Sequence, residues 1–167
     1  TLPLPARSEL GLSEMTLPVG RGGIVATAHP LATQAGVSVL ERGGNAMDAA
    51  IAAAAVLGVA QPMMSGLGGD SFVLFHDARS GLTHSIQGAG PAPHALADVV
   101  CRNGEPLPER GLLSAAVPGA VSAMCAAFER FAGGRLNLAQ LLEPAVQCAE
   151  HGTPVAHWVA RFFQRNE

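Results

Sequence analysis

The sequence contains one strongly alanine-rich run, AMDAAIAAAAVLGVA at residues 46–60, in which Asp48 is the only charged residue. Alanine favours the helix more than any other residue, and its small side chain lets neighbouring elements approach closely. Asn45 is placed to cap this helix, Asp48 lies near the positive end of its dipole, and Pro62 ends it. The run is too short to span a bilayer. We therefore expect a buried, tightly packed helix.

The rest of the chain shows both strand and helix patterns. The sequence predicts a buried strand at residues 23–28, a helix from Pro30 to the glycines at 43–44, a hairpin of strands 71–77 and 83–87, a short strand at 112–117, and helices that begin near Pro118, Asn137 and Val155. Pro144 lies inside the second of these last helices and predicts a kink or a restart. The final helix has an apolar stripe that needs a partner, so we expect the domain to continue in another chain or in further residues. This order predicts a layered α+β domain rather than repeated βαβ units.

Composition excludes several kinds of chemistry. All ten basic residues are arginines, so the chain has no lysine nucleophile or P-loop lysine, and with a net charge of −3 it has no basic stripe for nucleic acid. Cys101, Cys125 and Cys148 fit no zinc pattern, and we expect buried thiols. His76 and His84 are placed to face each other on neighbouring strands, but two histidines make a poor metal site. We therefore expect no bound metal.

A glycine-rich loop, SGLGGD at residues 65–70, joins the alanine-rich helix to the hairpin. Phosphate-binding loops place their glycines after a strand and before a helix, whose first N–H groups bind the anion. Here the order is reversed and lysine is missing, which argues against a phosphate cradle and against a dinucleotide-binding domain. We expect a tight, buried connection in which the glycines allow close packing and Asp70 accepts hydrogen bonds from the turn.

Several short motifs follow one another in a specific order along residues 22–158. They are AHPLA, GGNAMDAAIA, PMMSGLGGD and FVLFHD, and later LLSAAVPGAV and LAQLLEPAVQCAEHGTPV. Together they resemble the N-terminal part of the large subunit of γ-glutamyltransferases (γ-glutamyltranspeptidases), with an acylase-like member of the family left open. The resemblance covers most of the chain, and such a set is far more specific than any single glycine motif.

The resemblance implies a fold and a mechanism. The family belongs to the N-terminal-nucleophile hydrolases, which fold as a four-layer αββα sandwich, an α+β fold of which this chain would be a part. Residues 22–167 would form the N-terminal portion of the large-subunit domain, and residues 1–21 an N-terminal arm. In this family the precursor cleaves itself, and the new N-terminal threonine of the small subunit attacks a γ-glutamyl amide with its own α-amine as base. Water or an amino acid then takes the acyl group.

The same resemblance implies the partners. The small catalytic subunit comes from the same precursor, the substrate is a small γ-glutamyl or related acyl amide, as in glutathione metabolism, and neither a metal nor an organic cofactor is needed. No catalytic residue is expected in this chain. Thr1 is rejected as the nucleophile, because the prolines at positions 3 and 5 do not suit a core strand. Residues 1–20 lack a signal-peptide pattern, and relatives occur in the cytoplasm and the periplasm, so the compartment stays open.

One departure from the family pattern concerns substrate binding. In the family, an arginine just after the hairpin binds the α-carboxylate of the γ-glutamyl group, shortly before an Ala-Pro pair. If residues 92–93 are that pair, the two usual positions of the arginine fall on Gly88 and Pro91, and neither is arginine. Gly88, Ala89, Pro91 and Asp70 are therefore the candidate substrate-pocket residues.

The missing arginine leaves three functions open. A γ-glutamyl substrate would lose a charge-assisted contact of roughly 1.5–3 kcal/mol, so we expect weak γ-glutamyl turnover unless Arg102 from the following loop replaces the arginine. An acylase of the glutaryl or cephalosporin type is the alternative enzyme. A non-catalytic relative that uses the same scaffold for binding is the third possibility, and it would lack a threonine at the start of the small subunit.

Overall fold

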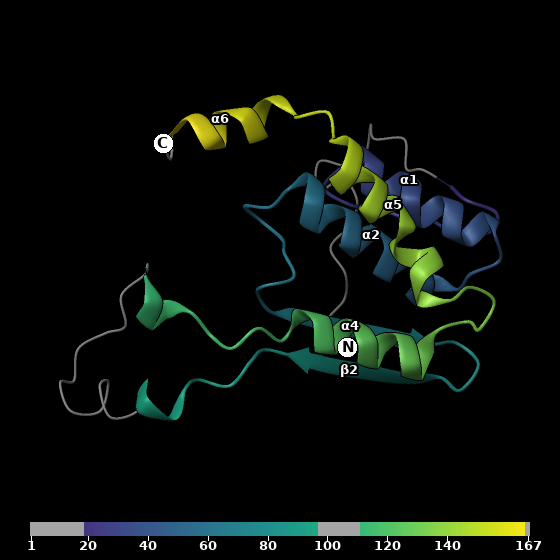
Figure 1. The fold of residues 1–167 in the computed structure, drawn as a ribbon. Coiled ribbons are helices and arrows are strands. Elements are labelled where there is room, and N and C mark those ends of the chain that lie inside the picture. The colour runs from purple at the N-terminus through teal and green to yellow at the C-terminus, as the bar shows by residue number, and fades with distance from the viewer. Residues whose placement is uncertain (1–18, 97–110, 166–167) are drawn as a thin grey trace, which may run out of the picture.

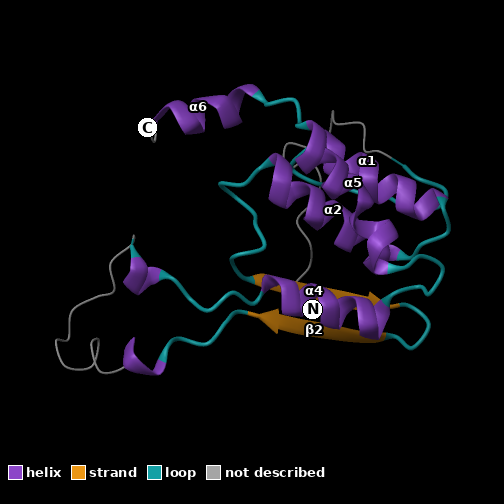
Figure 2. Ribbon diagram, viewed as in Figure 1, coloured by secondary structure: helices purple, strands orange, loops and turns teal. Residues whose placement is uncertain are grey.

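The computed structural model describes residues 19–96 and 111–165, which combine several helices with one antiparallel hairpin (Figures 1 and 2). The elements are α1 (Pro30–Glu41), α2 (Ala46–Ala60), β1 (Ser71–Asp77), β2 (Leu82–Gly88), the 3-10 helix η1 (Leu112–Ser114), α4 (Ala120–Phe131), α5 (Leu138–His151) and α6 (His157–Arg165). α4 packs on the hairpin, while α1 and α5 both pack against α2. This arrangement is α+β, as the sequence predicts.

The alanine-rich helix α2 is the centre of the core. Its buried residues are Met47, Asp48, Ala49, Ile51, Ala52, Ala53, Ala55, Val56 and Ala60. A capping box starts the helix, because Asn45 Oδ1 accepts from the Asp48 N–H at 2.9 Å and Asp48 Oδ2 accepts from the Asn45 N–H at 2.9 Å. The predicted burial is therefore confirmed, except for an exposed stripe formed by Ala46, Ala50 and Ala54.

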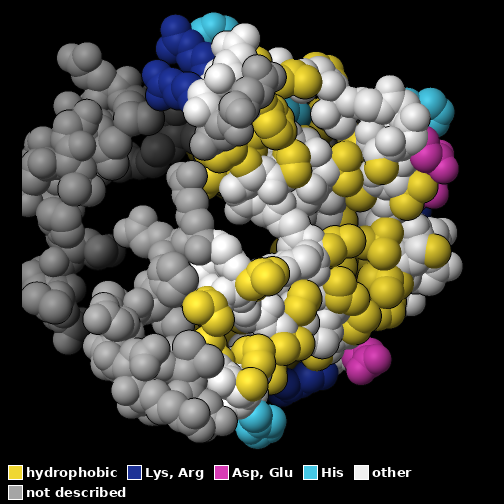
Figure 3. All heavy atoms as spheres, turned by 60° about the vertical axis from the view of Figure 1, so that its left-hand side comes forward, with side chains coloured by type: hydrophobic (Ala, Val, Ile, Leu, Met, Phe, Trp, Pro, Cys, Tyr) yellow, Lys and Arg dark blue, Asp and Glu magenta, His cyan; other side chains and the backbone are white. Residues whose placement is uncertain are grey.

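The hairpin has one covered face and one open face among the described residues. Val73, Phe75 and Ile86 pack toward the core formed with α2 and α4. On the other face of the hairpin, Phe72 is 69% exposed and Leu74 is 78% exposed. Hydrophobic side chains also gather over the face of the molecule shown in Figure 3, with few charged side chains among them.

The expectation that His76 and His84 face each other is wrong. The strand register pairs His76 with Thr83 and His84 with Phe75, so the two imidazoles point to opposite faces of the hairpin. His76 Nδ1 lies 3.1 Å from Thr83 Oγ1, and the His84 ring lies 5.1 Å from the ring of Phe131. Across residues 19–96 and 111–165, no three His, Cys, Asp or Glu side chains are grouped to hold a metal ion.

Two segments predicted as strands form no strand in the described fold. Residues 23–28 are extended but pair with no described strand, and Ile24 is 60% exposed instead of buried. Residues 112–117 begin as the 3-10 helix η1, and Leu112 is 94% exposed. A strand needs a neighbour for its N–H and C=O groups, and the described residues offer neither segment a neighbouring strand.

The later helices match their predicted patterns with small differences. α4 begins at Ala120 rather than at Pro118, and α5 continues through Pro144 without a restart. Cys125 and Cys148 are half-buried, not buried, whereas Thr1, Cys101 and Arg102 lie outside the described residues. None of the helices described here is both long and apolar enough to cross a membrane.

Candidate substrate-pocket wall

Three segments meet at the end of the hairpin where β1 begins and β2 ends. They are the glycine loop before β1, residues 88–91 after β2, and the start of α4. The Gly69 carbonyl oxygen accepts from the Gly119 N–H at 3.1 Å and from the Ala120 N–H at 2.9 Å. The first N–H groups of a helix have no acceptor within the helix, and the Gly69 carbonyl oxygen supplies one for these two. The glycine loop therefore presents a carbonyl oxygen to a helix N-terminus, which is the opposite of a phosphate cradle.

Asp70 connects the glycine loop to the end of the hairpin. Its Oδ1 accepts from the Gly90 N–H at 3.4 Å, a long and weak hydrogen bond, and its side chain is exposed. The predicted acceptor role is thus present, but the donor lies after β2 instead of within the turn of the glycine loop. Asp70 is the only ionisable side chain among the four candidate pocket residues.

The glycine loop itself is open within the described part of the chain. A Cβ added at Gly66 or Gly68 would meet no atom within 4 Å, and one at Gly69 would meet only Gly66 O, at 4.0 Å. The loop and Asp70 line a hollow of about 460 Å³ together with Pro62, Met64 and Ser65. The expectation that these glycines allow close packing is therefore wrong for the residues described here.

Close backbone packing occurs instead where residues 88–90 cross the start of α4. Gly88 is buried, and a Cβ there would lie 2.7 Å from the Ser71 carbonyl oxygen and would overlap the methyl group of Ala123. A Cβ at Gly90 would overlap the carbonyl oxygen of Val117, and one at Gly119 would overlap that of Gly88. The glycines of the segments QGAG and VPG are the sequence signal that could have indicated this crossing, but they lie about 30 positions apart and no local pattern connects them.

The other two candidate residues lie just beyond this crossing. Ala89 is half-buried and Pro91 is exposed. The Pro91 carbonyl oxygen accepts from the Val117 N–H at 3.5 Å, which joins the segment after β2 to the segment before α4. The structure thus brings Gly88, Ala89, Pro91 and Asp70 together at one end of the hairpin, with Gly88 enclosed and Pro91 open.

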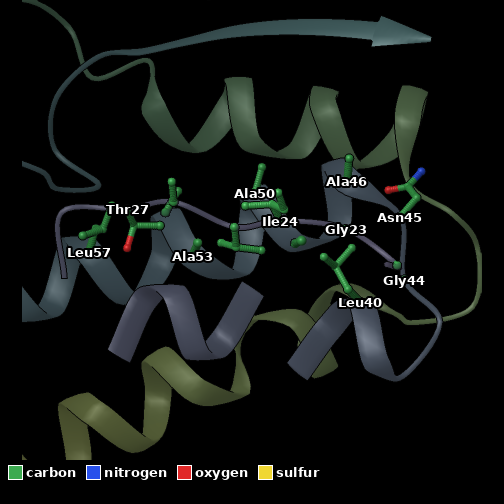
Figure 4. A pocket seen from close by; sticks show the side chains of 15 residues that line it. Gly23, Ile24, Thr27, Leu40, Gly44, Asn45, Ala46, Ala50, Ala53 and Leu57 are labelled. Atoms are coloured by element: carbon green, nitrogen blue, oxygen red, sulfur yellow. The ribbon is translucent and has the colours of Figure 1, made fainter. Parts of the chain in front are cut away.

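A second hollow, of about 560 Å³, runs between residues 22–27 and α2 (Figure 4). Its lining is mostly small and apolar, with Ala50, Ala53 and Leu57 on the side of α2. Thr27 is one of its two polar side chains, and its hydroxyl already lies 2.8 Å from both His29 O and Thr33 Oγ1. The other is Asn45, which caps α2. None of the described residues that line this hollow has an ionisable side chain, so they offer no acid or base for catalysis.

Comparisons with known proteins give a consistent result. The sequence model of the gamma-glutamyltranspeptidase family matches residues 32–167. The glutathione hydrolase proenzyme of Bacillus subtilis (strain 168) is 39% identical over 146 residues, which cover 82% of this chain and 24% of that protein. The acylase ACY 1 proenzyme of Pseudomonas sp. (strain SE83) is 37% identical over 157 residues, which cover 88% of this chain and 28% of that protein.

A solved structure agrees with these matches. Gamma-glutamyltranspeptidase of Helicobacter pylori superimposes with a TM-score of 0.77 at 29% identity, over 90% of this chain and 44% of that chain. The chain spans about a quarter of the length of the curated relatives described above, at 24% and 28%.

Proposed function

The chain belongs to the gamma-glutamyltranspeptidase family, and on that premise we propose that it forms the N-terminal part of the large subunit of an amidohydrolase or acyltransferase. The observation that carries the proposal is the family match over residues 32–167, which extends from α1 to α6. The resemblance and the α+β fold of an N-terminal-nucleophile hydrolase are confirmed by the same matches. Within the proposed subunit, residues 22–167 belong to the αββα domain and residues 1–21 form an arm.

In this proposal the covalent chemistry takes place on the small subunit. The hydroxyl of its N-terminal threonine attacks the carbonyl carbon of the acyl amide, and its α-amine takes the hydroxyl proton and passes it to the departing amine, which leaves an ester acyl-enzyme. Water or an amine then attacks the ester and releases the threonine. The present chain supplies part of the wall beside the acyl group, through Gly88, Ala89, Pro91 and Asp70.

The subunit arrangement is tested by intact mass measurement on the full-length protein after purification. We expect two polypeptides, of which the second begins with threonine, because the self-cleaving step creates the nucleophile. A single uncleaved chain, or a second polypeptide that begins with another residue, would support the non-catalytic binding relative instead.

The environment of Gly88 favours an acyl group that is not held by an arginine. An arginine side chain at position 88 would have to displace α4, because even a Cβ there overlaps Ala123. Position 91 has room for a longer side chain but holds proline. We therefore propose an acylase-like specificity in which binding does not depend on the α-carboxylate of a γ-glutamyl group. The Pseudomonas relative, whose name is acylase ACY 1, is consistent with this proposal.

Substituting Pro91→Arg is expected to create a carboxylate-binding site in the full-length processed enzyme. In the unmodified enzyme, removing the carboxylate from a γ-glutamyl-p-nitroanilide substrate, to give the 4-aminobutyryl analogue, should change kcat/KM by less than about threefold. In the Pro91→Arg enzyme the same change should lower kcat/KM by about tenfold or more, since a guanidinium–carboxylate contact contributes about 1.5–3 kcal/mol. Steady-state kinetics with the two anilides measure both ratios.

Two variants control this experiment. Pro91→Gln removes the proline and adds a long side chain without charge, so it should keep the ratio of the unmodified enzyme. Gly88→Arg should yield little folded protein, because position 88 is enclosed. Strong γ-glutamyl turnover by the unmodified enzyme, with marked stimulation by glycylglycine, would contradict the proposed specificity.

A further inference from the structure

A hollow of about 860 Å³ lies at the turn end of the hairpin, the end away from Gly88. Three segments that are far apart in the sequence line it. They are the turn between α1 and α2 (Gly43, Asn45, Ala46), the hairpin turn with its flanking strands (Phe75, His76, Asp77, Ala78, Arg79, His84), and the C-terminal end of α4 with the loop after it (Arg130, Phe131, Ala132, Gly133, Arg135). A volume of this size is typical of small-molecule sites.

Three arginines line this hollow: Arg79 from the hairpin turn, Arg130 from the end of α4, and Arg135 from the loop after it. The Arg130 Cζ atom lies 5.1 Å from the centroid of the Phe131 ring. The Arg135 side chain, including its guanidinium group, packs against Gly43, where an added Cβ would lie 2.5 Å from Arg135 Nη1 and 3.1 Å from Arg135 Cδ. Arg79 is exposed on the turn. None of the three forms an ion pair with a carboxylate of residues 19–96 or 111–165.

The carboxylates close to the hollow are already bound by other donors. Among the described residues of the lining Asp77 is the only acidic one, and it accepts from Ser80 Oγ at 2.8 Å and from the Arg79 N–H at 3.0 Å. These hydrogen bonds, and to a smaller extent the charge of the nearby Arg79 side chain, lower the pKa of the Asp77 carboxyl. Asp48 is fully buried and accepts from the N–H groups of Asn45 and Gly133. The lining therefore holds three arginines against one carboxylate, although the chain has a net charge of −3.

The three segments that carry the arginines are held together by contacts with one another. Asn45 Nδ2 donates to the Phe131 carbonyl oxygen at 2.7 Å, which joins the α1–α2 turn to the end of α4. The rings of Phe75 and Phe131 stack with centroids 4.9 Å apart, which joins the end of α4 to the hairpin. The backbone positions of the three arginines are thus fixed relative to one another, so binding an anion would not require the three segments to become ordered.

We propose that this hollow binds a small polyanion of the phosphate class, either an inorganic polyphosphate or a phosphate ester. The planar guanidinium group donates two parallel hydrogen bonds to phosphate oxygens, and three such groups around one hollow suit several phosphate oxygens at once. This inference does not depend on the acyl-transfer reaction, and its test does not use enzymatic activity.

The test is calorimetric titration of the full-length processed protein with inorganic tripolyphosphate at fixed ionic strength. We expect saturable binding to one site, weakened about tenfold or more by Arg130→Gln and by Arg135→Gln, since each removes a charge-assisted contact. The matched control is Arg161→Gln, which removes an exposed arginine on α6 that does not line the hollow. It should change the affinity by less than about twofold.

A second measurement guards against variants that simply fold poorly. Tripolyphosphate should raise the thermal unfolding midpoint of the unmodified protein and of Arg161→Gln, and should raise it less in Arg130→Gln and Arg135→Gln. The proposal is overturned by the absence of saturable binding to the unmodified protein. It is also overturned if Arg130→Gln and Arg135→Gln bind as tightly as the unmodified protein, or if Arg161→Gln weakens binding equally.

Discussion

Replacing Asp48 with alanine is expected to lower the free energy of unfolding by about 3 kcal/mol or more. The carboxylate is fully buried and accepts hydrogen bonds from two backbone N–H groups, that of Asn45 at 2.9 Å and that of Gly133 at 3.1 Å. Alanine would leave both N–H groups without their acceptor, and each such loss costs about 1–3 kcal/mol. The change would also disconnect the start of α2 from the loop after α4.

Denaturant unfolding of the full-length processed protein measures this effect, with soluble yield as a second readout if the variant does not accumulate. Glu129→Ala is the control, because Glu129 is an exposed carboxylate without a hydrogen bond to the described residues. It should change stability by less than about 0.5 kcal/mol. Equal stability of Asp48→Ala and Glu129→Ala would show that the buried carboxylate does not hold the two segments together.

Asp48 also shows how far the sequence alone predicts the core. Its position three residues after Asn45 is a local pattern, and the capping box it predicts is present. Its bond to Gly133 joins residues 85 positions apart, and no local pattern marks such a contact. The alanine content likewise predicts that α2 is buried, but not that α1 and α5 pack against it.

The incorrect predictions have a common physical origin. Residues 23–28 have the composition of a buried strand, but a strand forms only where a neighbour accepts its hydrogen bonds, and no described strand lies beside them. The relation between His76 and His84 depends on the register, and a shift of one residue would pair the two histidines on the same face of the hairpin. The local sequence determines which secondary structure a segment favours, whereas the segment beside it determines whether that structure forms and in which register.

The candidate site likewise depends partly on features that the sequence predicts and partly on contacts that only the fold creates. The resemblance to the family directs attention to positions 88 and 91, but only the structure shows that Gly88 is enclosed by α4 while Pro91 is open. The arginine-lined hollow could not be predicted, because Arg79 and Arg135 come from separate loops with unremarkable sequences. Only the packing of α4 against the hairpin brings them to one hollow.

The substitution Gly90→Ala is expected to be as damaging as the loss of Asp48, through a different cause. The added methyl group would overlap the carbonyl oxygen of Val117, which belongs to the backbone and cannot move aside as a side chain can. Gly90 does not have a positive φ, so the cost is steric rather than conformational. Because overpacking typically costs 1–3 kcal/mol even where side chains can adjust, we expect a loss of about 3 kcal/mol or more in the free energy of unfolding.

Gly66→Ala provides a matched control from the glycine loop, since a Cβ at position 66 meets no atom within 4 Å. It should change stability by less than about 0.5 kcal/mol in the same denaturant experiment. A large loss for Gly90→Ala with little loss for Gly66→Ala would place the tight backbone contact at the crossing of residues 88–90 with the start of α4. Equally large losses would instead mean that the glycine loop is as closely packed as Gly90 in the full-length protein, and equally small losses would contradict the tight contact of Gly90 with Val117.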